Sequence, residues 1–131
     1  MPVTKTIVIE SEPVAQPRPR VTRWGTFDPA KDKKNWARIQ IANQVTEKLT
    51  CPIRIDILYA LQVPKSTSKK KRVLMLNGEI KHVKRPDIDN YAKFTLDVLN
   101  DIAFVDDSQI YHLTAQKVYS EHPRTEITLK Y

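Results

Sequence analysis

The chain has 131 residues, of which 40% are hydrophobic and 28% charged, and this composition and length are typical of one soluble globular domain rather than two. No segment approaches the roughly 20 consecutive apolar residues that cross a bilayer, and the first residues form no secretory signal pattern, so we expect a cytoplasmic protein without a membrane partner. The net charge of +7 favours a polyanionic partner such as nucleic acid.

The cysteine and the histidines predict neither a disulfide nor a zinc site. Cys51 is the single cysteine and cannot form an internal disulfide. His82, His112 and His122 are scattered, so no Cys/His group has zinc spacing. Cys51 has no assignable basic partner and is interpreted as a small apolar residue beside a strand.

The first elements are a strand and a loop. Residues 4–10 alternate branched apolar and polar side chains with period two, which is typical of a strand. The prolines between residues 11 and 28 interrupt regular structure and predict an arginine-rich loop that could contact DNA. This loop also contains Trp24 and Phe27, and tryptophans in such settings are more often packing residues than platforms for bases.

A helix and a second strand follow. Residues 29–49 have apolar side chains near helical spacing, and Asp28 is suited to cap the helix. Residues 52–63 predict a strand, with isoleucines alternating with polar residues so that one face is buried near its start. The apolar positions expected on the buried side of the helix are Trp36, Ile39, Ala42 or Asn43, Val45 and Leu49.

Residues 64–84 form a basic insert. The pair Asn77-Gly78 is a hairpin signal. The two arms around it, 72–76 and 79–83, could therefore form a ribbon or stay mobile without a ligand, and the sequence leaves both open.

The last part of the chain predicts a second amphipathic helix from residue 88 or 89 to about 102, a turn at 104–107, and strands at 109–119 and 124–131. The order strand, helix, strand, insert, helix, strand, strand predicts the α+β class. We expect one domain over residues 1–131, with a mixed β-sheet of about four strands and two helices packed on one face.

The charges are clustered, since basic segments precede a segment that contains most of the aspartates, between Asp87 and Asp107. This order suits metal-assisted phosphate chemistry, in which cations hold the nucleic-acid backbone and carboxylates hold the metal. A solvated basic run is the ordinary alternative for the insert. The candidate DNA-binding residues are Arg18, Arg20, Arg23, Lys69, Lys70, Lys71, Arg72, Lys84 and Arg85.

Two pairs of carboxylates flank the second helix. Asp87 and Asp89 are two residues apart and project the same way from an extended segment, beside the positive end of the helix dipole. Mg²⁺ commonly takes one or two carboxylates, with water and substrate phosphate as its remaining ligands. The alternative is that these residues are helix caps and that Asp106 and Asp107 form a polar turn. A calcium loop fits less well, because its required glycine and glutamate are absent.

Lys93 lies four residues beyond Asp89, one helical turn away. It could offset repulsion between the carboxylates or reach a scissile phosphate. For an isolated lysine, the ordinary alternative is a surface ion pair with Asp89.

Three stretches resemble one known family: RPDIDNYAK at 85–93, DVLN at 97–100 and FVDDSQI at 104–110. They are similar to the Asp-x-Asp-Asn-x-x-Lys stretch, helix, and Asp-Asp-x-Gln turn followed by a strand in the RusA family of Holliday junction resolvases. The motif-bearing part spans roughly 85–110, and weaker similarity extends over most of the chain. The 64–84 insert departs from the shorter family members, so the resemblance implies no role for its lysines.

The resemblance implies that Asp87, Asp89 and Asp107 are the catalytic metal-binding carboxylates, that Asp106 is the weaker candidate of its pair, and that Lys93 assists. It also implies a homodimer, Mg²⁺ with Mn²⁺ as a substitute, no small-molecule cofactor, and paired nicks across a four-way DNA junction in recombination and repair. Two alternatives stay open: a non-catalytic DNA-binding module, and a metal-dependent nuclease for other branched DNA or for RNA.

Overall fold

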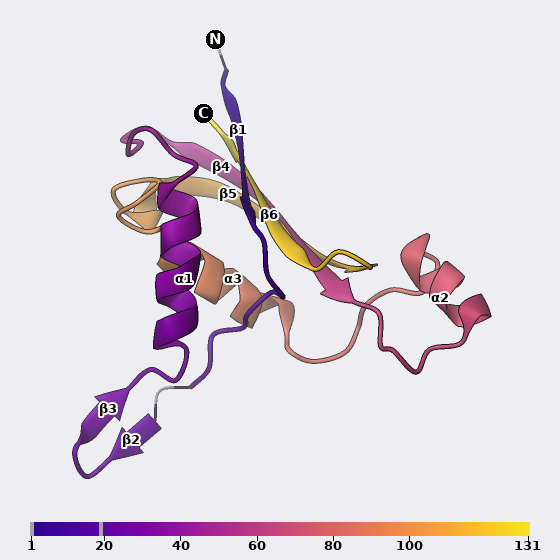
Figure 1. Cartoon of the computed structure of the whole chain (residues 1–131). Helices are drawn as coiled ribbons and strands as arrows, with labels where there is room; N and C mark the ends of the chain where they lie inside the picture. The colour runs from indigo at the N-terminus through magenta and orange to yellow at the C-terminus, as the bar shows by residue number, and fades with distance from the viewer. Residues whose placement is uncertain (1, 19) are drawn as a thin grey trace.

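The computed structural model describes residues 2–18 and 20–131, without the side chain of Arg20. Figure 1 shows a twisted sheet, two helices beside it and two segments that project from it. In chain order the elements are β1 (Thr4–Ile9), β2 (Arg20–Thr22), β3 (Gly25–Phe27), α1 (Lys31–Ala42), β4 (Ile53–Gln62), α2 (Lys69–Leu76), α3 (Ile88–Leu99), the 3-10 turn η1 (Asp107–Gln109), β5 (Ile110–Ser120) and β6 (Arg124–Lys130).

The main sheet has the strand order β1-β6-β4-β5. β6 is antiparallel to both neighbours, and β4 is parallel to β5. α1 and α3 pack on one face, where Ile41 and Val98 share a fully buried cluster with Ile55 and Ile127 of the sheet. This arrangement confirms the α+β class and the mixed four-stranded sheet, although the described chain has a third helix, α2.

α1 is shorter than predicted and faces the core with other residues. Its buried positions are Lys34, Ala37 and Ile41, whereas Trp36 and Ile39 are 56% and 54% exposed. Polar contacts explain this rotation, because Gln40 of α1 and Gln44 just after it bind the backbone at the end of β1. The contacts are Val8 N to Gln44 Oε1 at 2.9 Å and Glu10 N to Gln40 Oε1 at 2.8 Å.

Two segments that the sequence placed outside regular structure are ordered elements. Part of the proline- and arginine-rich segment forms the β2–β3 hairpin. In the insert, the sequence left open a ribbon or mobile arms; the structure instead has α2 at residues 69–76, and Asn77-Gly78 ends this helix. Gly78 adopts φ +87°, and the Ile80 amide bonds the Leu74 oxygen at 3.0 Å. A helix C-terminus uses the same left-handed backbone as a hairpin turn, so the Asn-Gly signal fits both.

The remaining elements agree with the sequence, except that α3 ends at Leu99 rather than near Ile102. In the described part of the chain, no helix has both the length and the apolar character needed to span a bilayer.

Candidate active site

The N-terminus of α3 presents the first two candidate carboxylates. Asp87 is the N-cap residue, but its side chain makes no capping hydrogen bond. Its backbone oxygen accepts from the amides of Asn90 and Tyr91, at 3.1 and 3.4 Å. Asp89 lies in the first helical turn, and both aspartates are exposed. The Asp87 carboxylate is therefore not used as a cap, and both carboxylates are accessible beside the positive end of the helix dipole.

α3 is fixed to the sheet by a buried polar contact. The Tyr59 and Tyr91 rings stack with centroids 5.1 Å apart. The Tyr59 hydroxyl lies 2.8 Å from Thr95 Oγ1, which donates to the Tyr91 oxygen at 3.0 Å. Burial raises the pKa of Tyr59, so its hydroxyl stays protonated. These contacts hold the first two turns of α3, and with them the two aspartates, in a fixed place on the sheet.

The segment before Asp87 is held from β5. Lys117 Nζ donates to the backbone oxygens of Lys84 at 2.8 Å and Pro86 at 3.2 Å. Lys84 and Arg85 themselves are exposed. The strand thus fixes the backbone of this segment while the two basic side chains remain available to a ligand.

The turn before β5 separates the roles of its two aspartates. Asp106 accepts a hydrogen bond from the Ser108 amide at 3.1 Å, and Gln109 Oε1 accepts from the Asp106 amide at 2.9 Å. The Ser108 hydrogen bond holds the pKa of Asp106 below its usual value. Asp107 is exposed and has no side-chain hydrogen bond or ion pair within the described residues. Asp106 therefore builds the turn, and Asp107 is the free carboxylate.

A hollow of about 380 Å³ brings Asp107 and Lys93 together. It also contains four polar side chains that the sequence analysis did not select and one leucine; its lining is Gln16, Lys34, Lys93, Leu96, Asp97, Asn100 and Asp107. Lys93 Nζ lies 3.9 Å from Asp89 Oδ2, so this lysine is close to the carboxylate in the first turn of α3 and shares the hollow with the carboxylate of Asp107. Asp87 and Asp89 do not line the hollow.

The missed residues Lys34 and Asp97 form an ion pair, with Lys34 Nζ 3.0 Å from Asp97 Oδ2. Lys34 lies three residues before Ala37 and seven before Ile41, on the buried face of α1. This helical spacing was the signal in the sequence that could have indicated a buried lysine. The side-chain amide oxygens of Gln16 and Asn100 are buried and have no hydrogen-bond partner among the described residues. The walls of the hollow therefore contain two lysines and two aspartates.

The carboxylates have the right chemistry for Mg²⁺ but do not form a finished cage. Among the described residues, no three His, Cys, Asp or Glu side chains lie close enough together to hold a metal ion. Mg²⁺ does not require such a cage, because one or two carboxylates with water and substrate phosphate are sufficient. Asp87, Asp89 and Asp107 fit this type of binding, because all three are exposed and none of their carboxylates is used to cap a helix.

The candidate DNA-binding residues lie in three places. Arg18 and Arg23 belong to the hairpin segment and are exposed, while the side chain of Arg20 is outside the described residues. Lys84 and Arg85 precede Asp87. The hairpin and α2 project from opposite ends of the molecule in Figure 1. The insert residues Lys69, Lys70, Lys71 and Arg72 are on α2, where Arg72 Nη1 lies 3.7 Å from Glu121 Oε1.

Free carboxylates beside exposed cations, on a rigid α+β scaffold, are the groups that an enzyme acting on phosphodiesters needs. The family model of Endodeoxyribonuclease RusA matches residues 10–130, and the chain belongs to this family of nucleases. The resemblance seen at residues 85–110 is thereby confirmed. The chain is also 37% identical to the Bacillus subtilis (strain 168) protein YqaN, which is described as uncharacterized, in an alignment of 131 positions that covers 93% of this chain and 92% of that protein.

Proposed function

We propose that the protein is a magnesium-dependent endonuclease that resolves four-way DNA junctions by paired phosphodiester hydrolysis. One observation supports this most directly: Lys93 lies 3.9 Å from Asp89 and lines the same hollow as Asp107. This geometry places one cation beside the Asp89 carboxylate and, with the Asp107 carboxylate, on a hollow that a phosphate can enter. Family membership supports DNA as the substrate.

In this proposal Asp87, Asp89 and Asp107 would hold Mg²⁺, or Mn²⁺ as a substitute; because they form no finished cage, water and the substrate phosphate would supply the other ligands. When bound, such an ion lowers the pKa of a water molecule and polarises the phosphate. Lys93 stabilises negative charge that develops on the phosphate oxygens. Arg85 and Lys84, adjacent to Asp87, bind the neighbouring phosphates of the same strand.

We also propose that the protein acts as a homodimer. A four-way junction has two equivalent strands to cut, and each chain supplies one candidate site. Two sites related by a two-fold axis make the paired incisions symmetrical, whereas one site produces a single nick. Sedimentation of the free protein and of its junction complex measures the number of chains, and one chain per junction would contradict this part of the proposal.

The test is incubation of the purified protein with a labelled four-way junction or a matched linear duplex, in Mg²⁺ or in chelator. We expect symmetrical Mg²⁺-dependent nicks on the junction alone. Asp89→Asn should abolish cleavage and leave junction binding largely intact. Asp101→Asn is the matched control, because Asp101 lies just beyond the other end of α3 and has φ +65°, a conformation that asparagine accepts.

Two outcomes would lead to other functions. Binding without cleavage in every metal condition would identify a DNA-binding module in which the aspartates are structural. Equal cleavage of junction, flap and RNA would identify a nuclease for other substrates. Salt dependence does not discriminate between them, since phosphate contacts weaken with salt in each case.

A further inference from the structure

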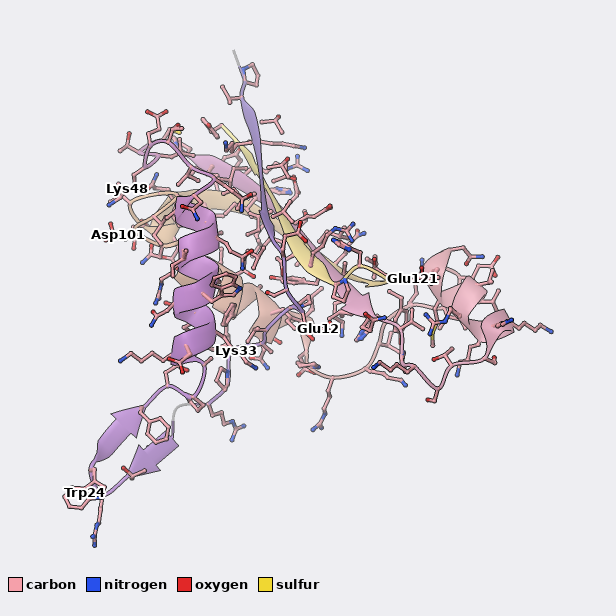
Figure 2. All side chains as sticks on the ribbon, in the orientation of Figure 1. Glu12, Trp24, Lys33, Lys48, Asp101 and Glu121 are labelled. Atoms are coloured by element: carbon pink, nitrogen blue, oxygen red, sulfur yellow. The ribbon has the colours of Figure 1, made fainter. Side chains whose placement is uncertain are left out.

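The β2–β3 hairpin presents an aromatic side chain that the fold does not use. Trp24 lies in the turn of the hairpin and is 85% exposed. In Figure 2 it lies at the far end of the hairpin, pointing away from the body of the protein. The Arg23 guanidinium carbon lies 4.9 Å from the centre of its ring. A tryptophan can bury 150–250 Å² on packing, so its exposure leaves a large surface available to a ligand.

The conformation of the turn is specified by local contacts. Thr22 Oγ1 accepts from the Trp24 amide at 3.2 Å and donates to the Gly25 oxygen at 3.1 Å. Gly25 has φ +126°, which other residues rarely adopt. The sequence thus encodes a tight turn with Arg23 and Trp24 at its tip, although neither side chain contributes to the core.

Both ends of the hairpin are attached beside the candidate active site. On one side, the Gln16 amide bonds the Asn90 oxygen at 2.9 Å, and Gln16 lines the hollow that contains Lys93 and Asp107. On the other side, Asp28 forms an ion pair with Lys34, which lines the same hollow. Four extended residues from Asp28 to Trp24 span about 13 Å. That is roughly four nucleotides along one DNA strand.

The charge of the hairpin segment suits nucleic acid. Residues 13–27 contain three arginines and no acidic residue. Arginines bind phosphates, and an exposed ring offers a flat surface on which a base can stack. Within continuous duplex, both faces of each base are already covered by their neighbours. A stacking tryptophan therefore requires a base that has lost a neighbour, as at a branch point.

We propose that Trp24 stacks on an unstacked base at the branch point of a DNA substrate whose phosphate lies at the candidate active site. The proposal rests on the proposed function only in taking branched DNA as the substrate. Arg23 holds the ring and an adjacent phosphate together. The hairpin thereby recognises the branch, while the carboxylates and Lys93 act on the phosphate.

The test compares Trp24→Ala, Trp24→Phe and Val21→Ala. Val21 is 80% exposed on the same hairpin and is not aromatic, so it is the matched control. Binding is measured in chelator, which prevents cleavage, on a four-way junction and a matched duplex. The junctions contain 2-aminopurine, whose fluorescence reports base stacking, either at the branch or within an arm.

Trp24→Ala should weaken junction binding by about 5- to 150-fold, the range for the loss of one stacked base, with much less change on duplex. Trp24→Phe should recover most of the affinity, and Val21→Ala should bind like the parent protein. The 2-aminopurine signal at the branch, but not in the arm, should change with the parent protein and not with Trp24→Ala.

Unchanged junction affinity in Trp24→Ala, or an equal loss on junction and duplex, would overturn the stacking proposal. These results are distinct from failure of the proposed nuclease function. Without any Mg²⁺-dependent cleavage, a branch-specific Trp24 effect would still support stacking on DNA. With normal cleavage, an inert Trp24 would remove the stacking proposal alone.

Discussion

Lys34 Nζ on α1 lies 3.0 Å from Asp97 Oδ2 on α3. Lys34 also pairs with Asp28, so one buried lysine joins the base of the hairpin to both helices. Burial lowers the pKa of Lys34, but the hydrogen bonds that it donates to Asp28 and Asp97 outweigh this effect and raise the pKa overall. Lys34 therefore remains a cation in the wall of the hollow.

Replacing Lys34 with methionine should destabilise the protein and reduce cleavage. The change leaves Asp28 and Asp97 without their shared partner, and because both are partly exposed we expect a loss of about 1–3 kcal/mol. Urea denaturation measures the free energy of unfolding. Lys33→Met, at the exposed neighbouring position, should change it by less than about 0.5 kcal/mol. Equal effects of the two variants would show that the ion pair does not hold the helices.

Asp106 and Asp107 should give opposite results when each is changed to alanine. Asp106→Ala removes the side-chain cap of the turn and should lower the melting temperature, while cleavage is retained below that temperature. Asp107→Ala should leave stability unchanged and abolish cleavage. Thermal unfolding and the junction assay separate the two roles. Loss of cleavage in Asp106→Ala with Asp107→Ala still active would reverse the assignment.

The family resemblance made Asp106 the weaker candidate of the pair, but nothing in the sequence supplied a physical reason for it, because both aspartates belong to one short turn. The distinction depends on the extended backbone of Asp106, which directs its carboxylate to the Ser108 amide. By contrast, Asp87, Asp89 and Lys93 could be selected in advance, because their spacing around a helix start is local. Spacing along a helix can be read from the sequence, whereas the hydrogen-bond partners of side chains in a turn depend on the backbone conformation of that turn.

The rotation of α1 shows a second limit. The large apolar residues Trp36 and Ile39 indicated the wrong buried face, because hydrophobicity was weighed without the polar contacts of Gln40 and Gln44 to β1. Lys34 was missed for the same reason. The start of β4 was predictable, since its alternating isoleucines are buried on one face of the sheet, whereas Tyr59, Ala60 and Leu61 at its end are all buried.

The stability of the insert should depend on pH through His82. Its ring lies 4.8 Å from that of Tyr119, and burial, together with Lys117 and Lys84, lowers its pKa. The unfolded chain therefore binds more protons as the pH falls through about 6.5, and stability decreases in that range. Denaturation across this range measures the slope. His82→Gln should reduce it, and His112→Gln, at an exposed position on β5, should not. An unchanged slope in His82→Gln would exclude His82 as the cause.

Lys117 should act on the candidate site through the backbone before Asp87. Its Nζ holds the oxygens of Lys84 and Pro86, so Lys117→Met releases the segment that places the Asp87 carboxylate. We expect a higher Mg²⁺ concentration for half-maximal cleavage and about a tenfold lower rate, comparable to losses on removing groups that orient metal ligands. Lys117→Arg should restore part of the cleavage rate and of the Mg²⁺ affinity, because arginine can still donate to the two oxygens.

Gln116→Ala, at the exposed neighbouring position, is the control. A variant with lower affinity for junction DNA but an unchanged Mg²⁺ requirement would instead show that Lys117 binds phosphate directly.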